Sequence, residues 1–212
     1  GEGLLMLRVV TPPASTALTT PEAVRAAFPD APGTLDLESL IARASDAIVA
    51  HCGRPFARAT YEERLPGYGT QVLLLTRRPV VTVTQVLHDS TPIVDFEVAD
   101  PAAGILYRAV GWTWTAGVGW SLAPQRIGGT ERPAFVVTYE AGYLLPGQEG
   151  RDLPADVEQA CIETVIAMIR RQSTDQDITE MRMDDVAVKF VGARSALPAI
   201  ARELLAPYVE VV

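Results

Sequence analysis

The chain has 212 residues, of which 48% are hydrophobic and 21% are charged, a composition typical of a globular protein and not of a disordered chain or a coiled coil. Its two cysteines, Cys52 and Cys161, are too few for a disulfide scaffold. The 26 acidic and 18 basic side chains give a net charge of −8, which is opposite in sign to that of a protein that neutralises nucleic-acid phosphates.

A short first helix is predicted after an extended, proline-bearing segment at residues 6–17. Thr20 can cap the helix, Pro21 suits the first helical position, and Glu22 complements the positive end of the helix dipole. Two prolines follow Phe28, so the helix should end there.

A second helix is predicted up to Cys52, with Gly53 as its stop signal. Either Thr34 or Asp36 can cap its start. Its apolar residues recur at helical spacing. They are Leu37, Leu40, Ile41, Ala44 and Ile48.

Between residues 58 and 139 the period changes to that of strands, rich in β-branched residues. The expected strands are 61–65, 72–75, 79–87, 93–98, 105–107 and 135–139. Because their connections are short, the sheet should be antiparallel.

Helices return after this region. The long helix at 153–171 is apolar on two faces, so it should be covered on both, either within its own domain or by a neighbouring subunit. Residues 185–191 alternate like a strand. A last helix at 198–206, with Ile200 and Leu204 facing inward, precedes an apolar tail.

These elements predict an α+β fold, in which a helical bundle from both chain ends carries an inserted antiparallel β sub-domain. The helical part should cover about 18–56 and 153–212, the β sub-domain about 57–145, and the whole of 1–212 should be one domain. The longest nearly apolar run, 160–169, is too short for a membrane span.

Catalytic chemistry is not indicated by the sequence. His51 and Cys52 are adjacent and would diverge by about 100° on a helix, so they do not suit one metal ion. Cys161 lies mid-helix among apolar residues, where burial would raise its pKa and reduce its reactivity. The acidic neighbours Glu62 and Glu63 would point to opposite faces of a strand and are interpreted as solvated.

All three tryptophans, Trp112, Trp114 and Trp120, lie within residues 111–129. They could cover the sheet or form an exposed contact surface in an assembly. With the two-faced helix and the apolar tail, they favour an assembly component over an enzyme. The alternative from another class is a small hydrolase or ligand-binding domain that uses the β region.

The order and spacing of several short motifs resemble the head–tail connector proteins, also called adaptor or head-completion proteins, of long-tailed bacteriophages and gene transfer agents. The helix that stops at Cys52-Gly53-Arg54 and the Leu-Pro-Ala-Asp start of the long helix are two such motifs. The resembling segments are 10–13, 18–24, 52–56, 78–86, 104–107, 137–143 and 153–160.

This resemblance implies a structural virion protein of the neck, present in the host cytoplasm during assembly, with no catalysis and no cofactor. Such proteins form a ring of about a dozen copies under the portal, extend the DNA channel and join the filled head to the tail or a stopper protein. The second face of the long helix is a candidate ring contact, and a charge of −8 would keep sliding DNA from adhering. A stopper or tail terminator is the alternative within this class.

The resemblance also suggests two contact surfaces. The last helix and tail are the candidate portal contact: Leu204, Leu205, Pro207, Tyr208, Val209, Val211 and Val212. The tail-side or inter-subunit candidates are Trp112, Trp114 and Trp120.

Overall fold

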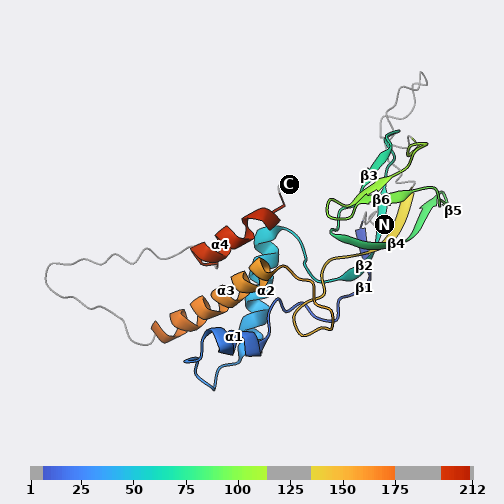
Figure 1. Ribbon diagram of the computed structural model, residues 1–212. Helices are drawn as coiled ribbons and strands as arrows, with labels where there is room; N and C mark the ends of the chain where they lie inside the picture. The colour runs from blue at the N-terminus through green and yellow to red at the C-terminus, as the bar shows by residue number, and fades with distance from the viewer. Residues whose placement is uncertain (1–6, 114–134, 175–196, 211–212) are drawn as a thin grey trace, which may run out of the picture. The chain divides into compact units, whose positions relative to one another are not determined.

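The structure is a computed structural model that describes residues 7–113, 135–174 and 197–210, with the side chains of 172–174 left out. The predicted α+β class is confirmed, because helices and antiparallel sheets both occur (Figure 1). The chain divides into two compact units. The β unit combines Gly1–Ala14 with Arg58–Tyr143, and the helical unit combines Ser15–Ala57 with Leu144–Val212.

The helices of the helical unit are α1 (Pro21–Ala27), α2 (Leu37–Cys52), α3 (Ala155–Thr174) and α4 (Ala199–Leu205), followed by the 3₁₀ turn η1 (Ala206–Tyr208). The predicted caps of the first two helices are confirmed. The Thr20 hydroxyl accepts from the Ala23 N–H at 3.3 Å, and the Asp36 carboxylate accepts from the Ser39 N–H at 3.1 Å. These side chains satisfy helix donors that have no partner within the helix.

Gly53 ends α2 in the left-handed conformation, with φ at 71°, and its N–H donates to the Val49 carbonyl at 3.0 Å. Glycine adopts this conformation without a Cβ clash, which is why it stops the helix here. None of the described helices combines the length and the apolar character needed to cross a bilayer.

The β unit contains two antiparallel sheets with a shared core. The five-stranded sheet has the order β1 (Leu7–Thr11), β2 (Ala59–Leu65), β8 (Phe135–Ala141), β4 (Val80–His88), β5 (Thr91–Pro92). The three-stranded sheet has the order β3 (Val72–Leu74), β7 (Ile105–Tyr107), β6 (Glu97–Asp100). The antiparallel pairing that the short connections predicted is confirmed.

Alternation along the strands places the core. On β8, Phe135, Val137, Tyr139 and Ala141 are buried while the residues between them are half-buried. They share one hydrophobic cluster with Leu106 and other residues of the smaller sheet. The prediction of one strand at 93–98 is wrong for 93–96, since that segment lies between β5 and β6. The predicted strand at 185–191 lies outside the described residues.

Candidate interaction surfaces

The long helix α3 is covered within its own unit. It packs against α4, α2 and α1. Both predicted apolar stripes are buried along most of their length, including Val165 at 0% exposure and Ile162 and Ile166 at 7%. Of the two expected coverings, the domain's own helices are therefore the one observed. The proposal that the second face of α3 is a ring contact is wrong, because little of that face is accessible to a neighbour.

Helix α4 packs on α3 through a different pair of residues from the predicted one. Ala201 and Leu205 are fully buried, whereas Ile200 is 50% exposed and Leu204 is half-buried. The prediction that Ile200 faces inward is wrong. Leu197, Ala201 and Leu205 form their own stripe at helical spacing, and the small Ala201 side chain permits close approach of the helix.

The chain after α4 returns to the carboxyl end of α2. The Tyr208 ring lies edge-on to Phe56, with 6.1 Å between ring centres. The Glu210 N–H donates to the Cys52 carbonyl at 2.9 Å, at the end of α2 where helix carbonyls lack partners within the helix. The last described residues are therefore held against the helical unit.

The predicted portal-contact residues occupy different environments. Leu205 is buried in the helical core, and Leu204 and Tyr208 are half-buried. Pro207 is exposed, and Val209 is 37% exposed. Val211 and Val212 lie outside the described residues. Pro207 and Val209 are therefore the described members with most surface to offer a partner.

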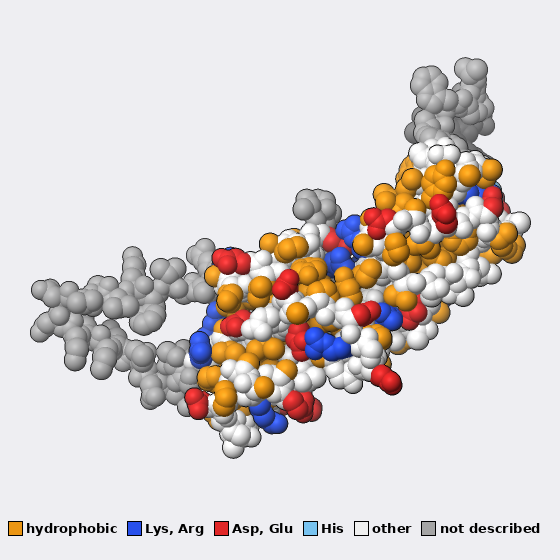
Figure 2. Space-filling model, in the orientation of Figure 1, with side chains coloured by type: hydrophobic (Ala, Val, Ile, Leu, Met, Phe, Trp, Pro, Cys, Tyr) orange, Lys and Arg blue, Asp and Glu red, His pale blue; other side chains and the backbone are white. Residues whose placement is uncertain are grey.

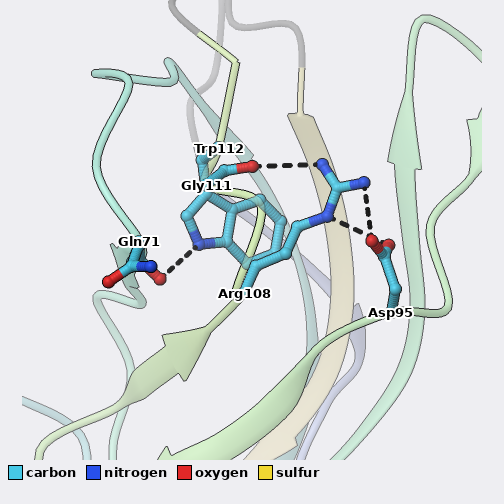
Figure 3. Close-up of polar contacts among 5 residues, drawn as sticks. All are labelled: Gln71, Asp95, Arg108, Gly111 and Trp112. Carbon is cyan, nitrogen blue, oxygen red and sulfur yellow. Dashed lines mark hydrogen bonds and ion pairs between the residues drawn. The ribbon is translucent and has the colours of Figure 1, made fainter.

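Trp112 lies in the core of the β unit with no exposed surface. Its indole Nε1 donates to the Gln71 carbonyl at 3.2 Å (Figure 3). Its ring meets the Phe135 ring edge-on, with 5.4 Å between ring centres. For Trp112 the structure matches the interpretation in which tryptophan covers the sheet. Trp114 and Trp120 lie outside the described residues.

Arg108 stands over the Trp112 ring, with 5.9 Å from its guanidinium carbon to the ring centre. It forms a bidentate pair with Asp95, at 3.0 Å for each hydrogen bond, and donates to the Gly111 carbonyl at 3.2 Å (Figure 3). The hydrogen bond from Arg108 lowers the pKa of the Asp95 carboxyl. This cluster holds the chain at Gly111 and Trp112 against the smaller sheet.

A buried carboxylate is the feature that sequence reasoning missed. Glu62 and Glu63 point to opposite faces of β2 as predicted, but Glu63 is only 2% exposed, so the solvated interpretation is wrong for it. Its carboxylate accepts from the Thr76 N–H at 3.0 Å, from the Thr76 hydroxyl and from the Tyr139 hydroxyl at 2.6 Å. Glu63 lies on the same face of β2 as Ala59 and Tyr61, whose side chains are buried. The alternation of side chains along a strand could therefore have predicted that Glu63 faces the core.

The cysteines are buried side chains of the helical core. Burial raises the pKa of the Cys52 thiol to about 11 and that of the Cys161 thiol to about 12. At neutral pH both are thus protonated and weakly nucleophilic. His51 is exposed on α2 while Cys52 is buried, as their divergence predicted. Within the described ranges, no group of three His, Cys, Asp or Glu side chains is arranged to hold a metal ion.

The net charge is divided unequally between the units. By sequence, the β unit carries nine acidic and eight basic side chains, hence −1, and the helical unit carries 17 acidic and 10 basic ones, hence −7. Figure 2 shows acidic side chains spread over the helical unit on the face drawn. Most of the charge of −8 therefore belongs to the helical unit.

Comparison with known proteins gives consistent relationships. A profile of the head completion protein family matches residues 26–211. The neck of a native gene transfer agent particle, computed with C12 symmetry, contains a chain that is 20% identical with a TM-score of 0.53. A chain in the virion of the native gene transfer agent is 19% identical with a TM-score of 0.53. A chain in the neck of the empty particle, computed with C6 symmetry, is 20% identical with a TM-score of 0.54.

Each of these structural matches covers 98% of this chain and 97% of the other. No curated protein matches the sequence. At such low identity the structural likeness establishes a shared fold. The profile match spans most of the sequence, from within α1 to the carboxyl-terminal tail. The chain belongs to the head completion protein family.

Proposed function

We propose that this chain is a structural protein of the neck of a tailed particle, where it assembles as a ring under the portal and joins the filled head to the tail. The observation that carries the proposal is the family membership over residues 26–211, together with a fold shared over almost the whole chain with neck proteins. The related necks were computed with twelvefold and sixfold symmetry, which supports a closed ring.

The environments of the buried carboxylate and the two buried thiols agree with a structural, non-catalytic role. Glu63 is occupied by Thr76 and Tyr139, and the Cys52 and Cys161 thiols are protonated core side chains. All three side chains are buried. The chain is proposed to act through its surfaces, and it needs no cofactor for that role.

The test of the ring is to mix the purified chain with the portal protein of the same particle and to image the product by electron microscopy. A ring of this chain stacked on the portal is the expected result. If portal and chain remain separate at micromolar concentrations, the proposed neck function is wrong.

The portal contact is proposed to lie on the carboxyl-terminal segment, with Pro207 and Val209 as its exposed described members and Val211 and Val212 continuing it. An apolar segment of this kind can fill a groove or add a strand to a partner. Tyr208 contributes indirectly, because its packing on Phe56 positions the segment.

A point substitution tests this contact more cleanly than deletion of residues 208–212, which would also remove the Tyr208 packing. Val209→Asp should weaken portal binding at least tenfold, which is about 1.4 kcal/mol, because it places a charge in an apolar contact. Ile200→Asp is the matched control, since Ile200 is also apolar and exposed but lies outside the proposed surface. Equal binding by the two variants would remove Val209 from the contact.

The tail-facing or inter-subunit contact is proposed to involve Trp114 and Trp120. Trp112 needs separate treatment, because Trp112→Ser would empty a core site and cost roughly 3–5 kcal/mol of stability. The double substitution Trp114→Ser and Trp120→Ser should therefore be made with Trp112 intact. Loss of tail joining with portal binding retained is expected, and tailed particles at normal yield would contradict the assignment.

The acidic charge is proposed to serve DNA passage. A negative wall repels phosphates, so DNA would slide without adhering. The helical unit, with a charge of −7, is the part that would supply this repulsion. Imaging of the assembled ring tests this: acidic side chains concentrated on the outer wall instead of the channel would refute it.

A further inference from the structure

Within the described residues, each sheet of the β unit has one edge strand that presents exposed apolar side chains. In the five-stranded sheet, β5 has only two residues, one of which is Pro92, and they pair with Leu87 and His88 alone. Residues 80–86 of β4 make up the rest of that edge, and two register shifts against β8 interrupt them. The opposite edge is β1, where Val9 is 51% exposed and Val10 is 47% exposed. Its register against β2 is regular over Leu7–Val9 and shifts between Val9 and Thr11. Among the described residues, β1 pairs with β2 and with no further strand.

The three-stranded sheet repeats this arrangement. Its β6 edge carries exposed Glu97 and Asp100, two charges of the same sign that discourage pairing with a further strand. Its β3 edge instead presents Val72 at 41% and Leu74 at 60% exposure. Within the described part of the chain, β3 pairs with β7 alone.

The hydrogen bonds of β3 show which of its backbone groups face outward. The Leu75 N–H donates to the Gly104 carbonyl at 2.8 Å, and the Gln71 carbonyl accepts from the Arg108 N–H at 2.9 Å. Antiparallel ladders alternate, so the peptide groups of Val72 and Leu74 point to the open edge. The Val72 carbonyl accepts from the Thr70 hydroxyl at 2.8 Å. Within the described residues, the Leu74 peptide groups and the Val72 N–H are the outward groups that remain for a further strand.

We propose that β1 of one copy pairs with β3 of the next copy, and that this contact closes the ring. A ring needs two different patches on each protomer, and the apolar edges of β1 and β3 supply them. In Figure 1 the two strands lie apart, β3 toward the top of the β unit and β1 toward its lower end. The inference rests on the proposed ring function and adds the surface that joins its subunits.

The charge distribution indicates that the partner at these sheet edges is a second copy of this chain. Two helical units would meet with −7 on each side, whereas two β units would meet with −1 on each side. Like charges at close range oppose association and are screened only beyond about 8 Å at physiological salt. The β unit is therefore the part through which identical copies can meet, and its open apolar edges supply the attraction.

Mixed single-cysteine proteins test the pairing on portal-bound rings. One protein carries Val10→Cys and the other Val72→Cys, each in the otherwise intact chain, whose buried Cys52 and Cys161 react slowly. Mild oxidation of the mixture should yield a disulfide-linked dimer on a non-reducing gel, and neither protein alone should yield it. Repeating the mixture with Val9→Cys and Leu74→Cys covers a shift of register. Val94→Cys, 86% exposed and on neither edge, is the control.

The outcomes separate this inference from the proposed function. Rings on the portal with edge-specific dimers support both. Rings on the portal without dimers in any edge combination overturn the β1–β3 pairing and leave the neck function standing. Failure of the unsubstituted chain to form a ring overturns both.

A second measurement uses charge in place of a cross-link. Leu74→Lys should reduce the fraction of portal particles that carry a complete ring at least tenfold, since lysine on an edge strand blocks pairing. Val110→Lys adds the same charge at a residue of the β unit that is 75% exposed and outside the strands. If both variants form rings equally well, β3 is not the contact.

Discussion

The Tyr139 hydroxyl donates a hydrogen bond to the buried carboxylate of Glu63 across 2.6 Å. Burial, together with the adjacent negative charge of Glu63, raises the pKa of Tyr139, so its hydroxyl keeps its proton at neutral pH. The same hydroxyl accepts from the Arg77 N–H at 3.1 Å. Glu63 and Tyr139 therefore connect β2 and β8 to the segment that follows β3, through polar groups inside an otherwise apolar core.

The first prediction concerns this buried acceptor. Glu63→Leu leaves the Thr76 N–H and the Tyr139 hydroxyl without their partner, so the unfolding free energy should fall by about 1–3 kcal/mol. Glu63→Gln retains an acceptor oxygen and should lose less. Glu62→Gln, on the outer face of the same strand, is the matched control and should stay within about 0.5 kcal/mol. Urea unfolding of the three variants measures the difference, and an equal loss for Glu63→Leu and Glu62→Gln would contradict it.

The second prediction concerns alkaline pH. The folded-state pKa values of about 11 for Cys52 and about 12 for Cys161 are above the value of about 8.5 for an exposed thiol. Above about pH 8.5 the unfolded chain binds fewer protons than the folded chain, so the unfolding free energy falls as pH rises. Each thiol contributes at most about 1.4 kcal/mol per pH unit, and its contribution levels off above its folded pKa.

The thiol contribution is measured by comparing variants. The double variant Cys52→Ala and Cys161→Ala should be less stable at pH 8, since two core side chains are shortened. Between pH 8 and pH 10, however, its unfolding free energy should fall less steeply than that of the unsubstituted chain. Parallel curves in urea unfolding would show that the thiols do not titrate on unfolding.

The third prediction concerns the end of α2. Gly53→Ala should cost roughly 1–2 kcal/mol, because φ at this position is 71° and a Cβ is strained there. Steric overlap is not the cause, since the nearest atom to an added Cβ, on Glu210, is 3.8 Å away. Gly33→Ala is the matched control, because an added Cβ there meets nothing within 4 Å. Thermal unfolding that shifts equally for both variants would count against backbone strain.

Local signals were sufficient for the helices and for most of the strands. Thr20, Asp36 and Gly53 act on backbone groups within a few residues of themselves, so their roles can be read from neighbours in the sequence. The α+β class followed because each period reflects the geometry of one element. The order of short motifs was also enough to indicate the family.

Where a helix has two apolar faces with the same spacing, tertiary packing decided which of them is buried. Ile200 with Leu204 and Ala201 with Leu205 have the same spacing on α4, and the second pair is buried because the smaller alanine lets α4 lie close to α3. The two-faced α3 was compatible with a neighbouring subunit or with its own domain, and three helices of its own unit cover it.

The sequence by itself determined the α+β class, the caps of the first two helices, and that two neighbouring acids on β2 face opposite ways. Only the tertiary structure decided that Glu63 is buried, that Trp112 is a core side chain, and which of the described strands lie at the sheet edges. The physical reason is distance along the chain. Caps and periodicity act between close neighbours in the sequence, whereas Glu63 and Tyr139 are 76 residues apart. The position of a strand at a sheet edge likewise depends on how distant strands pair with one another.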